Sequence, residues 1–272
     1  MDNQIIRILA SLFEHFSQEA QIVTDQMQRA TPLWQQIDTA VRRAYSIQTL
    51  DHDLTVEPRS DINDRLALFL ASTGAKFLDQ TISSPRRIIN PLLDRGVGSK
   101  SAHGANIEDV VCVDFDGMYP NIILRLCATG DIRMDRDLDH ILFVLKHKAA
   151  IKSALAGNRH ALNLYLNFLF GMLPAQDKER VTVIAYRLTA GMMGVTQHIV
   201  SDIDEHYFLN TPGFESEIRD KVGLLELPFE TSRISNLVLL GATRFIAIKE
   251  GDNRIRGLPK LSQSFRQQLG GL

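Results

Sequence analysis

Residues 110–122 read VVCVDFDGMYPNI and contain the transition that decides the fold. A short apolar, β-branched run that ends at an acidic residue is typical of a buried strand. We therefore expect a strand that delivers Asp114 at its end, followed by a glycine turn with free backbone N–H groups and then an aromatic residue. Hard carboxylate oxygens suit magnesium, so this turn can hold a divalent cation beside a triphosphate. Taken alone, an acidic turn at a strand end is also typical of a surface loop.

A second acidic turn lies downstream, at Asp202-Ile203-Asp204. The surrounding segment QHIVSDIDEHYFL predicts two short strands joined at the acidic pair. Alternation points both carboxylates to one side, where like charges repel unless cations lie between them. Two strands that each end in acid therefore suggest a two-metal phosphoryl-transfer site, in which one cation activates an attacking hydroxyl and the other holds the leaving phosphate.

Between the two acidic turns the sequence predicts a helical hairpin. Its helices span residues 138–155 and 159–173, and Gly157-Asn158 forms the tight turn between them. Polar residues recur at one-turn spacing on each helix and so line one face; they are Lys148 and Lys152 on the first helix, and Arg159, Asn163 and Asn167 on the second. Such a face binds a ligand or is solvated above a leucine core, and the spacing allows both.

The flanking segments are predicted to be mostly helical. Residues 1–45 carry an apolar stripe at helical spacing, which Pro32 interrupts; the stripe includes Ile5, Leu9, Leu12 and Phe16. It packs on its own domain or docks on another subunit, and periodicity does not separate the two. Further helices are expected over 65–80 and 180–193. The basic segment that follows residue 82 is either a DNA-facing loop or a solvated one.

Composition sets further bounds. The chain has 272 residues, of which 44% are hydrophobic and 23% charged, a balance typical of one or two folded domains. Thirty basic and 32 acidic residues give a net charge of −2, so a nucleic-acid surface must be a local patch. The cysteines Cys112 and Cys127 match no zinc or paired-thiol spacing. With no signal peptide or membrane-length apolar run, we expect a soluble cytoplasmic protein that contacts no membrane.

In order and spacing, these motifs resemble those of the family B DNA polymerases. The family's first motif, D-x-x-S-L-Y-P-S-I, appears as DFDGMYPNI; its fingers motif, K-x-x-x-N-S-x-Y-G, as NLYLNFLFG; and its D-T-D-S motif as DIDE. The later K-K-x-Y and K-G segments are similar to residues 242–245 and 255–259. The resemblance covers residues 95–262. Its compact spacing is most similar to the protein-primed, virus-associated branch, which would place a phage-encoded chain in the host cytoplasm.

The resemblance implies an α+β fold, with an antiparallel palm sheet backed by helices, a short helical-hairpin fingers insertion and a helical N-terminal segment. The implied boundaries are a helical segment over 1–60 that is a candidate for partner docking, a connector over 61–100, a palm over 101–139 and 173–262, fingers over 140–172 and a tail over 263–272.

The resemblance also implies the site residues. Asp114 and Asp204 would be catalytic carboxylates that hold two Mg²⁺ ions together with the Phe115 carbonyl, with Asp202 nearby. Tyr119 would be the steric gate that stacks under the sugar of the incoming nucleotide and excludes a 2′-hydroxyl. The implied nucleotide-binding set is Gly117, Met118, Tyr119, Lys148, Lys152, Arg159, Asn163 and Asn167, and the implied DNA-binding set is Arg244 and Lys249.

Several supporting residues depart from the family's motifs. The fingers lysine that contacts the triphosphate is Asn163, a neutral amide that cannot donate a proton to pyrophosphate. Arg159 lies one turn earlier, and its guanidinium can bind phosphates as a bidentate fork. The motif serines are Gly117 and Glu205, and the primer-strand lysine is Thr243. The metal ligands are thus retained while their polar neighbours are not.

Two functions compete on these grounds. The first is a DNA-directed DNA polymerase core subunit that adds deoxynucleotides to a primer 3′-end. The second is a polymerase-like subunit with weakened catalysis and a role in DNA binding or assembly. A metal-dependent nuclease explains neither Tyr119 nor the hairpin. The expected partners are primer-template DNA, deoxynucleoside triphosphates and separate proteins that supply a thumb and an exonuclease, because the chain has no segments that match these parts.

Overall fold

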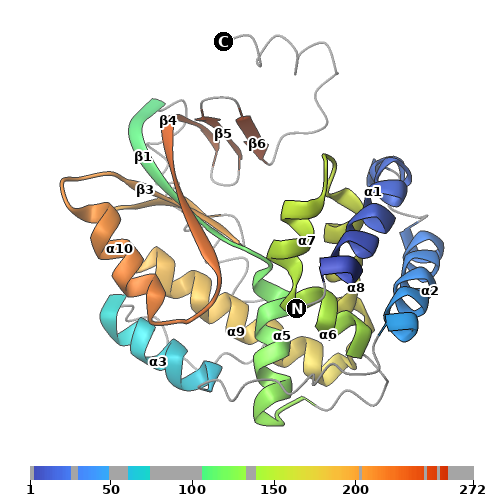
Figure 1. The fold of residues 1–272 in the computed structure, drawn as a ribbon. Helices are drawn as coiled ribbons and strands as arrows, with labels where there is room; N and C mark the ends of the chain where they lie inside the picture. Colours follow the sequence, from blue (N-terminus) through green and yellow to red (C-terminus); the bar gives the residue numbers. More distant parts are fainter. Residues whose placement is uncertain are drawn as a thin grey trace. The chain divides into compact units, whose positions relative to one another are not determined.

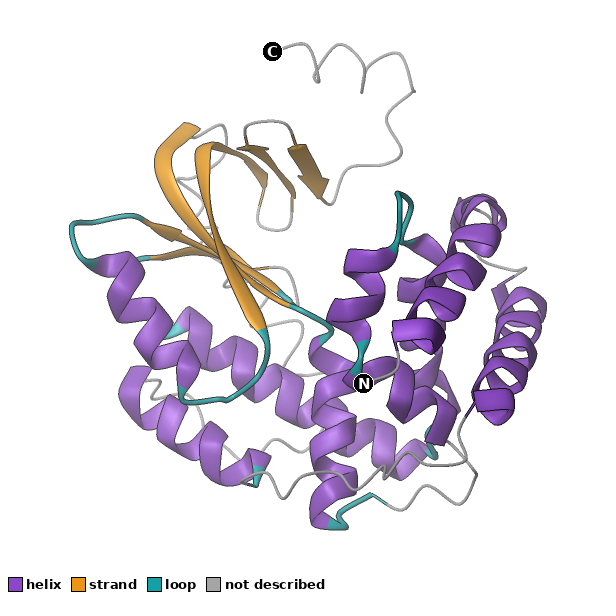
Figure 2. Cartoon of the chain, in the orientation of Figure 1, coloured by secondary structure: helices purple, strands orange, loops and turns teal. Residues whose placement is uncertain are grey.

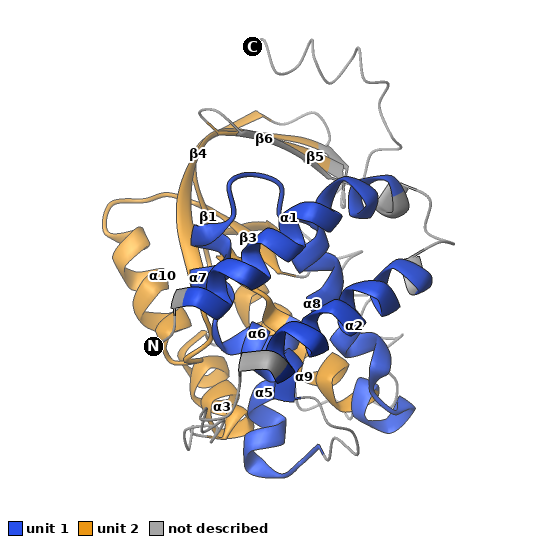
Figure 3. Ribbon diagram, turned by 45° about the vertical axis from the view of Figure 1, so that its right-hand side comes forward, with its two compact units in different colours: residues 1–59, 119–178 blue, residues 60–118, 179–272 orange. Residues whose placement is uncertain are grey.

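The computed structural model describes residues 3–25, 30–48, 61–73, 106–132, 139–201, 204–241, 244–249 and 252–256. The chain divides into two compact units (Figure 3). Unit 1 comprises residues 1–59 and 119–178, and unit 2 comprises residues 60–118 and 179–272. Helices and strands are both present, and the strands form one antiparallel sheet (Figure 2), which confirms the predicted α+β class.

Unit 2 contains the sheet. Its strands are β1 (Asn106–Phe115), β2 (His198–Ser201), β3 (Glu205–Leu209), β4 (Phe229–Gly241), β5 (Arg244–Lys249) and β6 (Asp252–Arg256), in the spatial order β2-β3-β1-β4-β5-β6 (Figure 1). Every neighbouring pair is antiparallel. The predicted strand over 110–115 is therefore β1, and it lies inside the sheet between β3 and β4. The two strands predicted around the second acidic turn are β2 and β3.

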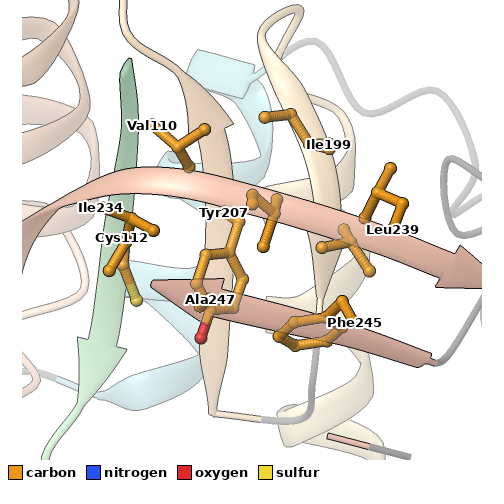
Figure 4. Close-up of a cluster of buried hydrophobic side chains, with 10 residues drawn as sticks. Val110, Cys112, Ile199, Tyr207, Ile234, Leu239, Phe245 and Ala247 are labelled. Carbon is orange, nitrogen blue, oxygen red and sulfur yellow. The ribbon is translucent and has the colours of Figure 1, made fainter. Parts of the chain in front are cut away.

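The two faces of the sheet bury different side chains. Because side chains alternate along a strand, Val111 and Val113 lie on the face that carries Phe208 of β3. The ring of Phe208 is 5.5 Å from that of Phe214, so helix α10 (Phe214–Gly223) packs against this face. The opposite face carries an apolar cluster (Figure 4), in which the Tyr207 and Phe245 rings meet edge to face at 4.9 Å.

Two further helices of unit 2 pack tightly on each other. They are α3 (Ile62–Thr73) and α9 (Ala175–Met193). A Cβ atom added at Gly191 of α9 would overlap Cε1 of Phe69 and lie 2.9 Å from Cδ2 of Leu70. Phe69 is fully buried, so its ring has no room to move away. The close approach of α3 to α9 therefore requires glycine at this position.

Unit 1 is helical. It contains α1 (Asn3–Asp25), α2 (Ala30–Gln48), α5 (Met118–Thr129, from its second residue), α6 (Asp139–Lys146), α7 (Lys148–Ala154) and α8 (His160–Met172). Ile5, Leu9 and Phe13 of α1 are buried, and the Phe13 ring lies 5.7 Å from that of Tyr165 in α8. Ile5 and Leu9 of the apolar stripe thus pack within their own unit, whereas Leu12 and Phe16 are half-buried.

A carboxylate ties the N-terminal helices to the hairpin. Asp38 of α2 accepts hydrogen bonds at Oδ1 from the Tyr165 hydroxyl at 3.0 Å and lies 2.7 Å from Nε2 of His140, while Arg42 Nε donates to Oδ2 at 2.9 Å. Burial raises the pKa of Asp38, but the hydrogen bonds from His140, Arg42 and Tyr165 outweigh it and lower this pKa to about 2. Ionised Asp38 therefore connects α2 with α6 and α8.

Several boundaries differ from the expectations. The helix predicted over 138–155 is two helices that break at His147, and the helix predicted over 180–193 begins at Ala175. The helix predicted over 65–80 is described from Ile62 to Thr73; residues 74–105 and the tail lie outside the described part. The palm and fingers boundaries stay a prediction.

Neither Cys112 nor Cys127 is part of a disulfide, and burial raises the pKa of Cys127 to about 11. In the part of the chain that the structure describes, no helix is both long enough and apolar enough to cross a bilayer.

The contact at Gly191 predicts that Gly→Ala destabilises the protein here, the opposite of its usual effect in a helix. In a helix, Gly→Ala ordinarily stabilises by about 1 kcal/mol. We expect Gly191→Ala instead to lower the free energy of unfolding by about 1–3 kcal/mol, because the added methyl overlaps the Phe69 ring. Urea denaturation measures this difference. Gly223→Ala in α10 is the control, since a Cβ there meets nothing within 4 Å; equal effects of the two substitutions would contradict the close packing.

The Asp38 contacts predict a pH-dependent stability. Because its folded pKa is lowered to about 2, the contribution of Asp38 is complete above its unfolded pKa of 3.8 and is lost as pH falls through about 2. We expect Asp38→Asn to reduce the free energy of unfolding at pH 7 by on the order of 2 kcal/mol, with the difference shrinking below pH 4. Denaturation at several pH values measures it. Glu19→Gln is the control, because Glu19 is exposed on α1 and its substitution removes the same charge. If the stability of that variant depended on pH in the same way, the Asp38 network would be contradicted.

Candidate metal and nucleotide site

The two acidic motifs meet at one end of adjacent strands. Asp114 is the next-to-last residue of β1, and its register partner on β3 is Glu205. One step further, the Phe115 N–H donates to the carbonyl oxygen of Asp204 at 2.9 Å. Asp114 is half-buried and Asp204 is exposed. The structure therefore places these two predicted metal ligands in neighbouring positions of the sheet, while Asp202 lies outside the described residues.

Two further carboxylates flank Asp114: Glu205, which the sequence marked only as a departure from the motif, and Glu230, which it did not mark. Its register partners are Glu205 on β3 and Glu230 on β4, and cross-strand partners share a face of the sheet. Glu205 is only 3% exposed, and its Oε2 accepts a hydrogen bond from the Tyr207 hydroxyl at 2.9 Å. Glu230 is exposed. Only the strand register identifies these neighbours, because Glu230 lies in no motif.

The carboxylate oxygens at this site are suitable ligands for magnesium, but they do not surround an ion completely. Within the described residues, which omit Asp202, no group of three or more His, Cys, Asp or Glu side chains is arranged to hold a metal ion. Mg²⁺ is commonly bound by one or two carboxylates together with substrate phosphates rather than by an all-protein cage. The neighbouring positions of Asp114 and Asp204 fit that mode, with oxygen ligands of the hard type.

The turn after β1 accounts for one departure from the family's motif. Gly117 has φ of 67°, a left-handed conformation that a side chain disfavours. The Asp116 N–H donates to the Pro228 carbonyl at 3.0 Å and fixes this turn against the segment before β4. Helix α5 then begins at Met118, so the two N–H groups predicted to face the triphosphate lie at a helix N-terminus, which favours anions.

In unit 1, the nucleotide-binding candidates on α8 share one face of the helix. Arg159 precedes the helix, and Asn163 and Asn167 follow at one-turn spacing; all three are exposed. Phe170 continues this face, and its ring meets that of Tyr119 edge to face at 5.1 Å. The opposite face is buried and comprises Ala161, Leu162, Tyr165, Leu166 and Leu169. The structure thus brings the predicted steric gate to the end of the polar face.

The remaining predicted nucleotide- and DNA-binding residues differ in how far they are buried. Lys148 opens α7 and is buried at 8% exposure, whereas Lys152 one turn later is half-buried. Lys249 is half-buried at the end of β5, and the side chain of Arg244 lies outside the described part. Phe245, which stands in the motif position of the family's tyrosine, is 1% exposed within the apolar cluster.

Comparisons with known proteins give a distant structural likeness. No protein-family model matches the sequence, and no curated protein matches it. Among solved structures, the chain is similar to the family B DNA polymerase from the hyperthermophilic archaeon Pyrobaculum calidifontis, with a TM-score of 0.36 and 14% identity. The similarity covers 76% of this chain and 38% of the polymerase.

The positive φ at Gly117 yields a stability prediction. Restoring the serine of the family's motif by Gly117→Ser should lower the free energy of unfolding by about 1–2 kcal/mol, because a Cβ strains the left-handed conformation. Gly117→Asn is the matched variant and should lose less, since asparagine tolerates this region better. Urea denaturation of both variants measures the effect; a serine variant as stable as wild type would contradict the turn geometry.

Proposed function

We propose that this chain is the palm-and-fingers core of a DNA-directed DNA polymerase of the family B type, which extends a primer 3′-end with deoxynucleotides. The observation that carries the proposal is the hydrogen bond from the Phe115 N–H to the Asp204 carbonyl. It joins two acidic motifs that are far apart in sequence at one end of adjacent strands. An unrelated pair of surface loops would not be expected to meet in this register.

The proposed metal ligands are Asp114, Asp204 and the Phe115 carbonyl, with Asp202 close in sequence. Two bound Mg²⁺ ions would supply activation of the primer hydroxyl and stabilisation of the charge on the triphosphate. The chain's own contribution is to hold the carboxylates at fixed strand positions, so that little reorganisation is needed when charge develops. Glu205, held by the Tyr207 hydroxyl, adds negative charge beside Asp114 and favours cation binding.

The proposed nucleotide contacts come from α5 and α8. The Gly117 and Met118 N–H groups and the Arg159 guanidinium would bind phosphate oxygens, and the Asn163 and Asn167 amides would hydrogen-bond to the nucleotide. The Phe170 ring restricts the Tyr119 ring through their edge-to-face contact. Tyr119 would thereby keep a fixed position under the sugar and exclude a 2′-hydroxyl.

The choice of DNA as substrate rests on this steric gate and on local charge. With a net charge of −2, the protein has no global attraction for a polyanion. Duplex binding would therefore rely on the local basic residues, which are Lys148, Lys152, Arg159, Arg244 and Lys249. Protein partners that supply a thumb and an exonuclease belong to the same proposal and would add phosphate contacts.

A second candidate is a polymerase-like subunit with weakened catalysis that binds DNA or serves assembly. The exposed neutral amide of Asn163 favours it, because this position on α8 lacks the charge that a lysine would present to a triphosphate. The two candidates differ in whether the wild-type chain extends a primer.

The carboxylate assignment predicts a large loss of activity. Asp114→Asn and Asp204→Asn should each slow primer extension by more than about a hundredfold, because each removes a charged ligand from the developing phosphate charge. Extension of a labelled primer with Mg²⁺ measures the rate. Asp220→Asn on α10 is the control: it loses the same charge at an exposed position of the same unit. Full activity in both site variants would remove the assignment, and no extension by wild type would favour the assembly role.

The steric-gate assignment predicts a change in sugar selectivity. Tyr119→Ala should raise the incorporation of ribonucleotides relative to deoxyribonucleotides by about tenfold or more, because removal of the ring relieves a clash that opposes the 2′-hydroxyl. Tyr119→Phe retains the ring and its contact with Phe170, so its selectivity should stay near that of wild type. Competition between the two nucleotide types in primer extension measures the ratio. An unchanged ratio in the alanine variant would show that Tyr119 only packs against its neighbours.

A further inference from the structure

A chain of buried polar groups joins β2 to β3 close in sequence to Asp204. The Ser201 hydroxyl oxygen is 2.7 Å from Nε2 of His198 and 2.7 Å from Nδ1 of His206. Ser201 and His198 are each 8% exposed, and His206 is fully buried. These three residues, here called the hydroxyl bridge, connect β2 with β3 within unit 2.

An irregularity in β2 makes this contact possible. Side chains three residues apart normally lie on opposite faces of a strand. The register with β3 shifts between His198 and Val200, so one extra residue is accommodated in β2. Such a bulge re-aims side chains, and it brings the His198 ring to the side on which Ser201 lies opposite His206.

The Ser201 hydroxyl is the group within hydrogen-bond distance of both others. Each ring reaches it through one nitrogen, at 2.7 Å in both cases. A neutral imidazole has one N–H donor and one acceptor nitrogen. A serine hydroxyl donates once and also accepts, so it bonds to one ring and receives a bond from the other. An alanine would leave two ring nitrogens buried without these bonds.

The hydroxyl bridge is adjacent to both acidic motifs. Ser201 immediately precedes Asp202 in the sequence, and His206 follows Asp204 by two residues. The His206 ring also lies 5.7 Å from the ring of Phe115. The backbone N–H of Phe115 is the group that holds Asp204 beside β1. The network thus joins β2 to β3 and lies beside Phe115, the neighbour of Asp114 on β1.

We propose that Ser201 is a positioning residue: through His198 and His206 it fixes the end of β2 to β3 next to Asp204, and so sets the affinity of Asp114 and Asp204 for divalent cations. This inference rests on the proposed function, because it assumes that these carboxylates bind metal. Groups that orient metal ligands without touching the metal typically change its affinity by about 10- to 100-fold when they are removed. A side chain that served stability alone would change the melting temperature without changing metal affinity.

The test measures cation binding by the full chain. Mn²⁺ is titrated into the protein, and the free ion is followed by electron paramagnetic resonance. We expect Ser201→Ala to raise the Mn²⁺ dissociation constant by about tenfold, and Ser201→Thr, which keeps the hydroxyl, to remain within about twofold of wild type. Ser17→Ala is the matched control, because Ser17 is also buried and its hydroxyl donates to backbone carbonyls of unit 1 at 2.6 and 2.7 Å. Its Mn²⁺ affinity should be unchanged even where its melting temperature falls.

The outcomes separate this inference from the proposed function. Should Ser201→Ala fail to fold, His198→Phe replaces it, since that variant keeps a ring of similar shape and removes the bond to Ser201; it should also weaken Mn²⁺ binding. Wild-type affinity in the folded Ser201→Ala or His198→Phe variant, with binding lost in Asp204→Asn, would overturn the positioning role alone. A wild-type chain that binds no Mn²⁺, or binds it equally well after Asp114→Asn and Asp204→Asn, would overturn the proposed function and this inference together.

Discussion

The antiparallel register of β1 against β3 and β4 is the constraint on which the candidate site depends. It places Asp114 opposite Glu205 on one side and opposite Glu230 on the other, and it places Asp204 beside Phe115. A slip of one residue would turn Asp114 to the face where Val111 and Val113 pack, and would bring Val113 or Phe115 to the position of the acid. The apolar residues on both faces of β1 make such a slip costly, because they would lose their burial.

The same register concentrates negative charge, and this has an energetic consequence. Like charges directly across a pair of strands destabilise a sheet, and Asp114 has an acidic partner on both sides. The structure offsets part of this cost at Glu205, which accepts the Tyr207 hydroxyl at the edge of the apolar cluster. Divalent cations would offset more, so metal binding and the stability of this end of the sheet are expected to be linked.

The sequence predicted the parts of the structure that local pattern determines. The strand at β1, the turn at Gly117 and the β2–β3 pair follow from short apolar runs that end in acid or glycine, and the structure has all of them. The α8 face with Asn163 and Asn167 follows from helical spacing in the same way. Each of these features can be predicted from its own segment of sequence, without knowing which residues pack against it.

The parts that depend on contacts distant in sequence were not predictable. The apolar stripe with Ile5 and Leu9 looks the same whether α8 or another subunit covers it, and only the structure shows that it packs within unit 1. Glu230 became a neighbour of Asp114 through strand register alone. The contact of Ser201 with His198 depends on a bulge that no turn residue in the sequence announces.

The most direct test of the account is to locate the metal. Crystals of the full chain soaked in Mn²⁺ and measured at a wavelength where manganese scatters anomalously would show each bound ion as a peak in the anomalous difference map. The account predicts anomalous peaks within coordination distance, about 2.0–2.2 Å, of the carboxylate oxygens of Asp114 and Asp204. Saturating Mn²⁺ that gives no peak at these carboxylates, or peaks only elsewhere on the protein, would contradict it.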